Sequence, residues 1–269
     1  MLDLEAARFI EYAKIIYTLV FLARFSIHDI VKREVADPEV YAYTGGAVLF
    51  YIASTALALQ YLTPQYVVVQ TIFSLAIAPG LFYALYVKGL MGLGDVYVAS
   101  GLSLTFTYPV LFNLSNAPGT PVILPPVITI ILYACASIIL YSIVKALYTV
   151  LKYKEMVSQL STKHKILLPI LAKPMRIREY LETRFFYPLT IIEEREGGVA
   201  YAVRLTYDVE REEYTAHQER LKKLLEKGLV KPDDYIWVSY GIPFLALILM
   251  GLVLFLLIGD GPLTPDLPR

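Results

Sequence analysis

Two aspartates stand next to long apolar runs of this sequence, where a carboxyl group is suited to acid–base chemistry. Asp95 lies in "MGLGDVYV" (91–98) and is the only acidic residue from position 40 to position 154. Asp29 lies in "SIHDIVKREV" (26–35). Two carboxyls close together in a partly dry site cannot both ionise cheaply, so one acts as a base and the other as an acid. Such a pair can activate a water molecule without a covalent intermediate.

The glycines before Asp95 suit that chemistry. Gly92 and Gly94 can adopt backbone angles closed to other residues, and they leave room for a substrate backbone. A simpler interpretation stays open for each aspartate. Asp29 can be a solvated acid at the membrane edge, paired with a basic residue of the following "KR". Asp95 can be the N-cap of a helix.

Long apolar segments must position these residues. The chain has 269 residues and is 57% hydrophobic, with a mean hydropathy of +0.56, so we expect an α-helical polytopic membrane protein. A helix needs about 20 apolar residues to cross a bilayer. Six runs are predicted to do so: 9–27, 42–61, 66–87, 95–113, 124–148 and 236–258. The single cysteine, Cys135, is interpreted as a small buried hydrophobe, and it excludes an internal disulfide.

The charge distribution predicts an orientation in the cell membrane. The 24 Lys and Arg residues balance 24 Asp and Glu residues, but the loops 62–65 and 114–123 contain no Lys or Arg. The positive-inside rule therefore places the N-terminus outside and the segments 28–41, 88–94 and 149–235 in the cytoplasm. Asp29 and Asp95 then lie at the same, cytoplasmic face of the membrane.

The chain divides into three predicted parts: membrane helices with both aspartates over 1–149, a soluble domain over 150–234, and a last helix with a short outer tail over 235–269. The stretch "FYPLTIIEEREGGVAYAVRLTYD" predicts a β-hairpin around 196–198. Leu221, Leu224 and Leu225 have helical spacing, and Gly228 is the expected C-cap. We therefore expect a small cytoplasmic α+β insertion before the last helix.

Further residues are candidates for substrate binding. Glu34, Asp37 and Glu39 follow Asp29 and can attract a basic peptide, although ordinary loop acids are the equal alternative. Pro243 is expected to kink or open the start of the last helix and to expose backbone that aligns an extended substrate, although a purely structural kink is the equal alternative.

Three stretches resemble the GxGD family of membrane aspartic proteases, and within it the archaeal preflagellin and prepilin peptidases. "SIHDIVKREV" is similar to the first-aspartate motif, "GLGDVYV" (92–98) matches the second, and "YIWVSYGIPFLALIL" (235–249) is similar to the opening of the last span. The resemblance covers most of the chain. It implies that Asp29 and Asp95 are the catalytic pair, whereas His28 is expected to support the site rather than to catalyse.

The resemblance also implies a substrate: a preflagellin or prepilin whose short basic signal peptide is cut before a hydrophobic helix. Because one cysteine cannot build a four-cysteine zinc domain, we expect no methyltransferase activity. No metal, cofactor or nucleic acid is expected, and the lipid bilayer is the other predicted partner. Two alternatives stay open: a presenilin-like or signal-peptide-peptidase-like protease, and an ion-coupled transporter whose two acids bind a cation.

Overall fold

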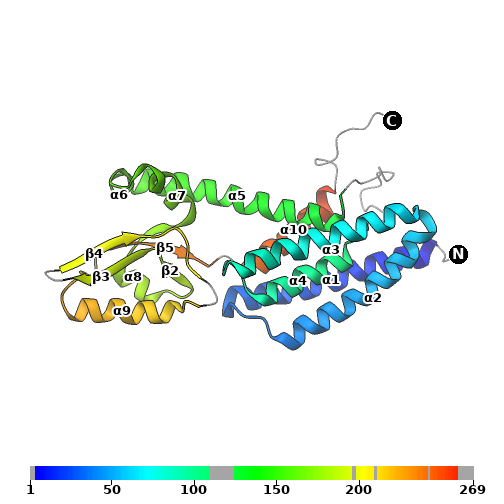
Figure 1. The fold of residues 1–269 in the computed structure, drawn as a ribbon, viewed down its shortest axis with the longest axis horizontal. Coiled ribbons are helices and arrows are strands. Elements are labelled where there is room, and N and C mark those ends of the chain that lie inside the picture. Colours follow the sequence, from blue (N-terminus) through cyan, green and yellow to red (C-terminus); the bar gives the residue numbers. More distant parts are fainter. Residues whose placement is uncertain (1–3, 109–123, 196–197, 209–210, 242, 260–269) are drawn as a thin grey trace. The chain divides into compact units, whose positions relative to one another are not determined.

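A computed structural model describes residues 4–108, 124–195, 198–208, 211–241 and 243–259. The chain is mostly helical and forms two compact units, residues 1–138 with 243–269 (unit 1) and residues 139–242 (unit 2). Unit 1 contains the following helices, labelled in Figure 1: α1 (Leu4–Lys32), α2 (Asp37–Tyr61), α3 (Pro64–Val87), α4 (Leu93–Thr105), the start of α5 (Pro126–Lys152) and α10 (Phe244–Ile258).

The helices of unit 1 pack around an apolar core. Helix α4 lies between α2 and α3, and α1 packs along α10. Two glycines permit close contacts: a Cβ atom added at Gly101 of α4 would lie 2.5 Å from the ring of Tyr43. One added at Gly251 of α10 would clash with the backbone oxygen of Ile130 on α5. Small residues at helix contacts are typical of membrane bundles.

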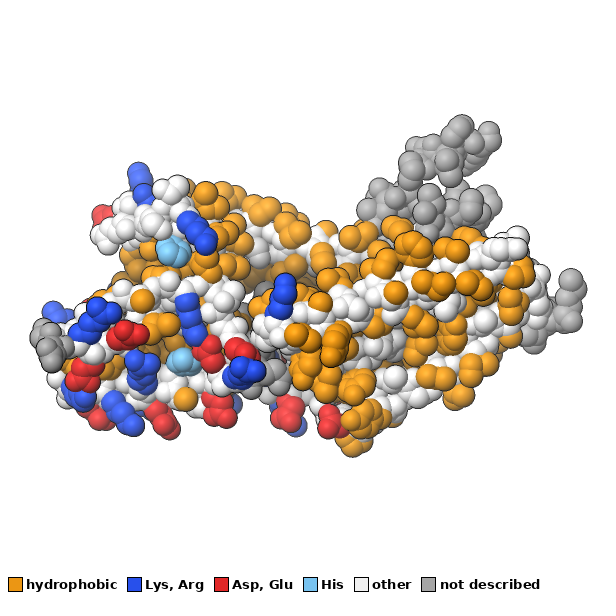
Figure 2. All heavy atoms as spheres, viewed as in Figure 1, with side chains coloured by type: hydrophobic (Ala, Val, Ile, Leu, Met, Phe, Trp, Pro, Cys, Tyr) orange, Lys and Arg blue, Asp and Glu red, His pale blue; other side chains and the backbone are white. Residues whose placement is uncertain are grey.

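The outer surface of unit 1 is apolar. Figure 2 shows hydrophobic side chains spread over its helices, and large ones such as Phe9, Ile16 and Leu49 are 74%, 60% and 70% exposed. Exposed apolar area on this scale is unusual for a soluble protein and suits contact with lipid. Cys135 is also exposed, so the expectation that it is buried is wrong. Apolar sequence alone does not distinguish a side that faces protein from a side that faces lipid.

Three of the described helices are long and apolar enough to cross a membrane: α2 over Asp37–Gln60, α3, and α5. Helix α10 is apolar but shorter, and α4 has 13 residues. The predicted span 95–113 and the loop 114–123 extend into residues outside those that the structure describes. Six crossings and their orientation stay predictions.

Several charged residues of α1 are paired within unit 1. Lys14 Nζ donates to Glu11 Oε1 at 2.6 Å, and their side chains are 1% and 4% exposed. Arg24 binds Glu39 of α2 through two hydrogen bonds of 2.9 and 2.6 Å. Ionisable residues inside a membrane helix are costly unless they are paired. These pairs explain how so polar a helix packs among apolar neighbours.

Unit 2 combines short helices with two small sheets. Its elements, after the rest of α5, are α6 (Lys154–Ser158), α7 (Thr162–Leu171), β1 (Lys173–Arg176), α8 (Ile177–Glu182), β2 (Phe186–Pro188), β3 (Thr190–Arg195), β4 (Gly198–Val203), α9 (Tyr214–Glu226) and β5 (Tyr235–Tyr240). Strand β5 pairs antiparallel with both β1 and β2, and β3 pairs antiparallel with β4. The small α+β region that the sequence predicts is present.

The predicted hairpin and helix of unit 2 are confirmed. Strands β3 and β4 pair in register from Thr190 with Val203 to Arg195 with Gly198; residues 196 and 197 lie outside the described residues. Helix α9 buries Leu221 and Leu224. It ends in the expected left-handed glycine, because Gly228 has a φ of 69° and its N–H donates to Leu225 O at 2.9 Å.

The predicted start of the last span, at 236, is wrong. Residues Tyr235–Tyr240 form strand β5, and the helix begins only at Phe244. Side chains of β5 alternate between two apolar cores: Ile236 and Val238 enter one, and Trp237 enters the other. Because both faces of the strand are buried, its sequence is a continuous apolar run, which cannot be distinguished from the start of a membrane helix by hydropathy.

Candidate active site

Asp29 lies in the last turns of α1 and binds the start of α10. The backbone N–H of Leu245 donates to its Oδ2 at 3.0 Å. The guanidinium of Arg33, four residues on, lies 3.9 Å from its Oδ1, so the ion pair that the simpler interpretation predicts is present but long. The side chain of Asp29 is 14% exposed. It is therefore held inside unit 1 rather than solvated.

Burial changes the acidity of Asp29, which lies two residues beyond the predicted span 9–27. Burial raises the pKa of its carboxyl above the ordinary value, because a charge loses hydration there. The hydrogen bond from Leu245 and the charge of Arg33 oppose that rise. A carboxyl with a raised pKa keeps its proton more readily than a solvated one, which suits a group that shares a proton with a second carboxyl.

Asp95 lies in the first turn of α4, three residues after the N-cap Gly92. Its Oδ2 accepts the backbone N–H of Gly92 at 3.2 Å, and its own N–H donates to Gly92 O at 3.2 Å. Asp95 therefore stabilises the start of this helix, but the simpler interpretation is wrong about its position, because the N-cap is Gly92 and Asp95 is the third residue of the helix. One carboxylate oxygen makes this contact, and capping does not exclude a catalytic role. The side chain is half-buried.

The ends of three helices lie together in unit 1. Figure 1 shows the C-terminal end of α1 and the N-terminal ends of α4 and α10 at the same end of the bundle. The contact between Asp29 and Leu245 joins two of them. The fold thus carries both aspartates to one end of unit 1, although they are far apart in sequence.

The two glycines differ from expectation in one respect. Gly92 has an ordinary extended backbone, with φ −80° and ψ 157°, and Gly94 lies within the helix, so neither uses the left-handed region that favours glycine. Among the residues before Asp95, Gly89 does so, with a φ of 68°. A Cβ atom added at Gly94 would meet no atom within 4 Å outside the neighbouring backbone of its own helix, and the approach of a substrate there stays a prediction.

The three acids after Asp29 fall into two groups. Glu34 and Asp37 are exposed. Glu39 binds Arg24 and lies 4.0 Å from His28 Nδ1. Glu39 is therefore engaged within the fold, whereas Glu34 and Asp37 are accessible to a partner. His28 lies beside this ion pair, and its supporting role stays a prediction.

Pro243 directly precedes α10 and is its N-cap residue. Because the helix begins after it, the proline limits the helix rather than bending it. Its carbonyl accepts the N–H of Leu247 at 3.3 Å, which begins the helical hydrogen bonds. Leu245, the residue that contacts Asp29, was not predicted from the sequence. Its contribution is a backbone N–H, which leaves no signal in a side-chain pattern.

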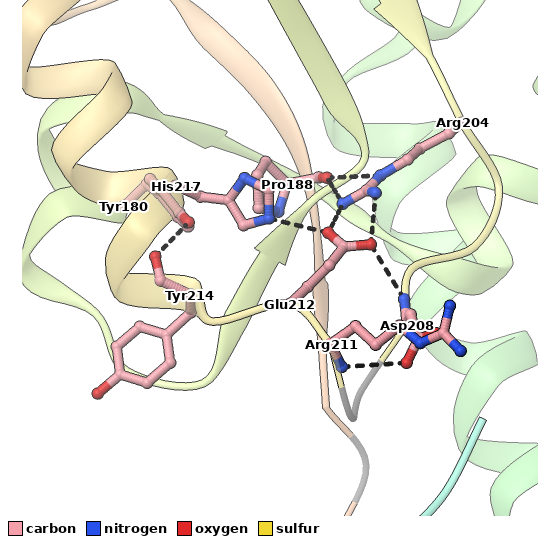
Figure 3. A network of polar contacts seen from close by, with 8 residues as sticks. All are labelled: Tyr180, Pro188, Arg204, Asp208, Arg211, Glu212, Tyr214 and His217. Atoms are coloured by element: carbon pink, nitrogen blue, oxygen red, sulfur yellow. Dashed lines mark hydrogen bonds and ion pairs between the residues drawn. The ribbon is translucent and has the colours of Figure 1, made fainter. Parts of the chain in front are cut away.

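A second polar cluster lies in unit 2 (Figure 3). Glu212 accepts hydrogen bonds from Arg204, from the Asp208 N–H at 3.0 Å and, in one tautomer, from His217 at 2.8 Å. Arg204 also donates to Pro188 O at 3.1 Å. Burial alone would raise the pKa of Glu212, but these donors outweigh it and lower the pKa to about 2. The cluster holds the start of α9 against the end of β4 and is interpreted as structural.

Between β3 and α9 lies a cavity of about 400 Å³. It is lined by two apolar residues and by charges of both signs: Ile192, Leu224, Glu194, Arg220, Lys223, Glu226 and Lys227. Lys227 binds Glu194 at 2.6 Å, so two of the charges that line the cavity are paired with each other.

Within the described part of the chain, no group of three or more His, Cys, Asp or Glu side chains is placed to hold a metal ion. The absence of a metal or cofactor stays a prediction.

Comparison with known proteins gives one family match. A family model described as Archaeal Peptidase A24 C-terminus Type II matches residues 164–261. The match covers most of unit 2 and the whole of α10, and it does not include the segments that carry Asp29 and Asp95. No curated protein matches the chain significantly.

Proposed function

We propose that this chain, an archaeal type IV peptidase-like protein by its match to the A24 C-terminus, is a membrane aspartic endopeptidase that uses Asp29 and Asp95. The observation that carries the proposal is the gathering of the ends of α1, α4 and α10 at one end of unit 1 (Figure 1). Two partly buried carboxyls, Asp29 and Asp95, lie on helix ends at this end of unit 1, and Asp29 binds the start of α10. The family match favours a peptidase over an ion-coupled transporter.

The chemistry needs one ionised and one protonated carboxyl. The ionised one takes a proton from water, whose oxygen attacks the peptide carbonyl, while the protonated one donates its proton to the carbonyl oxygen. The resulting tetrahedral intermediate collapses when a carboxyl transfers a proton to the departing amine. The raised pKa of Asp29 supports such sharing, because it brings the acid form closer to neutral pH.

The proposed substrate is a preflagellin or prepilin with a short basic signal peptide before a hydrophobic helix. The exposed acids Glu34 and Asp37, close in sequence to Asp29, support this choice because they would attract a basic segment. The open space at Gly94 supports the close approach of an extended backbone. Cleavage is proposed at the cytoplasmic face, because the basic residues of the substrate keep its signal peptide on that side of the membrane.

A cleavage assay tests the proposal. The full chain in detergent is incubated with a pre-pilin that carries a basic-Gly junction before its hydrophobic helix, and the shorter product is measured. We expect the product to disappear in Asp29→Asn and in Asp95→Asn, which keep the shape of the side chain. Asp233→Asn, on an exposed side chain of unit 2, is the matched control and should cleave normally. Persistent cleavage in either of the first two variants would refute the pair.

A further inference from the structure

The first turn of α10 presents a backbone N–H group to Asp29. Leu245 is the second residue of the helix, and the first four N–H groups of a helix have no acceptor within it. That of Leu245 donates to Asp29 Oδ2 at 3.0 Å. The Leu245 side chain is 2% exposed, so the contact lies at a packed position. The helix start therefore finds its acceptor on α1.

We infer that the backbone N–H of Leu245 is a positioning donor for the catalytic pair: it fixes one oxygen of Asp29 and stabilises the carboxylate form, which burial disfavours. The positive end of the α10 dipole acts in the same direction. The inference rests on the proposed peptidase function. It assigns a role to a residue that the motif pattern does not mark.

Among the charged groups that the structure describes near Asp29, none makes as short a contact with its carboxyl as the Leu245 N–H does. Helix α10 brings no charged side chain. From α2, Glu39 is bound to Arg24, and α4 contributes Asp95. On the side of α1, Arg33 lies 3.9 Å from Asp29 Oδ1, beyond hydrogen-bond length. Arg33 also favours the ionised form, but it does not orient the carboxylate as a short N–H bond does.

The second aspartate is held in a comparable way. Asp95 Oδ2 accepts the N–H of Gly92 at 3.2 Å, at the start of α4. Each carboxyl thus has its Oδ2 against a backbone N–H at a helix start, from α10 for Asp29 and from α4 for Asp95. The difference lies in the origin of the donor. The donor to Asp95, the N–H of Gly92, lies at the start of the helix that carries Asp95. The donor to Asp29 belongs to another helix, so this hydrogen bond is lost if α10 moves away.

An NMR titration tests the contact without any substrate. The full chain is labelled with ¹⁵N-leucine in detergent, and the Leu245 amide is assigned by its loss in Leu245→Ala. We expect this resonance to shift with pH as the Asp29 carboxyl ionises, and the shift to vanish in Asp29→Asn. An amide that does not titrate, or that still titrates in Asp29→Asn, would overturn the inference. Peptidase activity has no influence on this result.

A kinetic experiment tests the role. Replacing the Leu245 residue by its α-hydroxy acid removes the N–H and keeps the side chain, and Leu245→Ala does the reverse. We expect the ester variant to move the acid limb of the kcat/KM profile upward by about one pH unit, and Leu245→Ala to leave that limb in place. An unshifted ester variant would overturn the role of Leu245. A wild-type chain that cleaves nothing would instead contradict the proposed function, while the NMR result would stand.

Discussion

At the residue scale, the two aspartates combine a structural contact with a proposed catalytic role. Asp95 caps α4 and Asp29 binds the start of α10. Helix starts favour negative charge, so each contact supports a carboxylate, and at Asp29 it opposes the effect of burial. The same residue can therefore stabilise the fold and be prepared for chemistry. Substitutions that separate these two effects are the informative ones.

Gly94→Ala separates stability from activity. Alanine is favoured over glycine within a helix by about 0.5–1 kcal/mol, and the space beside Gly94 is open, so the variant should be as stable as the wild type or slightly more so. If a substrate backbone occupies that space, kcat/KM should fall by roughly 10- to 100-fold, the range that a displacement of about 1 Å can cost. Thermal unfolding and cleavage rates are measured together. A stable variant with full activity would contradict the predicted approach path.

Charge reversal tests substrate attraction by the exposed acids. Glu34→Lys and Asp37→Lys should each raise KM by roughly two- to fivefold and change kcat less, because exposed ion pairs contribute about 0.2–1 kcal/mol. The effect should weaken at high salt. Glu219→Lys, on an exposed residue of α9 in unit 2, is the control. Unchanged kinetics in both variants would remove these acids from the binding site.

At the element scale, unit 2 depends on the polar cluster around Glu212. Glu212→Gln should lower the free energy of unfolding of unit 2 by about 1–3 kcal/mol, the usual loss for hydrogen bonds to a charged group. Trp237, the single tryptophan of the chain, is buried in β5, so its fluorescence in a urea titration reports on this unit. Glu219→Gln is the matched control and should unfold like the wild type.

The difference in free energy of unfolding between the wild type and Glu212→Gln should depend on pH in a direction set by the pKa of Glu212. The pKa of Glu212 falls from 4.5 to about 2 in the folded unit. A carboxyl with a lowered pKa contributes stability that is complete above the unfolded value and is lost as the pH falls through the folded value. The gap between the wild type and Glu212→Gln should therefore be full above pH 4.5 and close toward pH 2. A gap independent of pH would contradict the assignment.

The sequence predicted elements well where one pattern determines them. The hairpin of β3 and β4 and the glycine end of α9 follow from turn chemistry and were found as expected. Strand β5 was mistaken for the start of a helix because burial on both faces produces the same apolar run. The hydrogen bond from Leu245 to Asp29 was not predictable, since it joins backbone and side chain from residues 216 positions apart.

At the scale of the whole molecule, the membrane character rests on surface as well as sequence. Contact between water and the exposed apolar side chains of unit 1 in Figure 2 is unfavourable, whereas contact with lipid is not. Sequence patterns predicted this class and the small α+β region that precedes the last apolar helix. They could not give the number of crossings, because a short apolar helix such as α10 and a charged helix such as α1 depart from the simple length rule.

The most direct test of the central claim is whether the two aspartates act as one unit. It compares kcat/KM for the wild type, Asp29→Asn, Asp95→Asn and the double variant on the same pre-pilin. Residues that act together in catalysis show strongly non-additive losses. We predict that each single variant loses as much activity as the double variant. Losses that add, or substantial cleavage in one single variant, would contradict a catalytic pair.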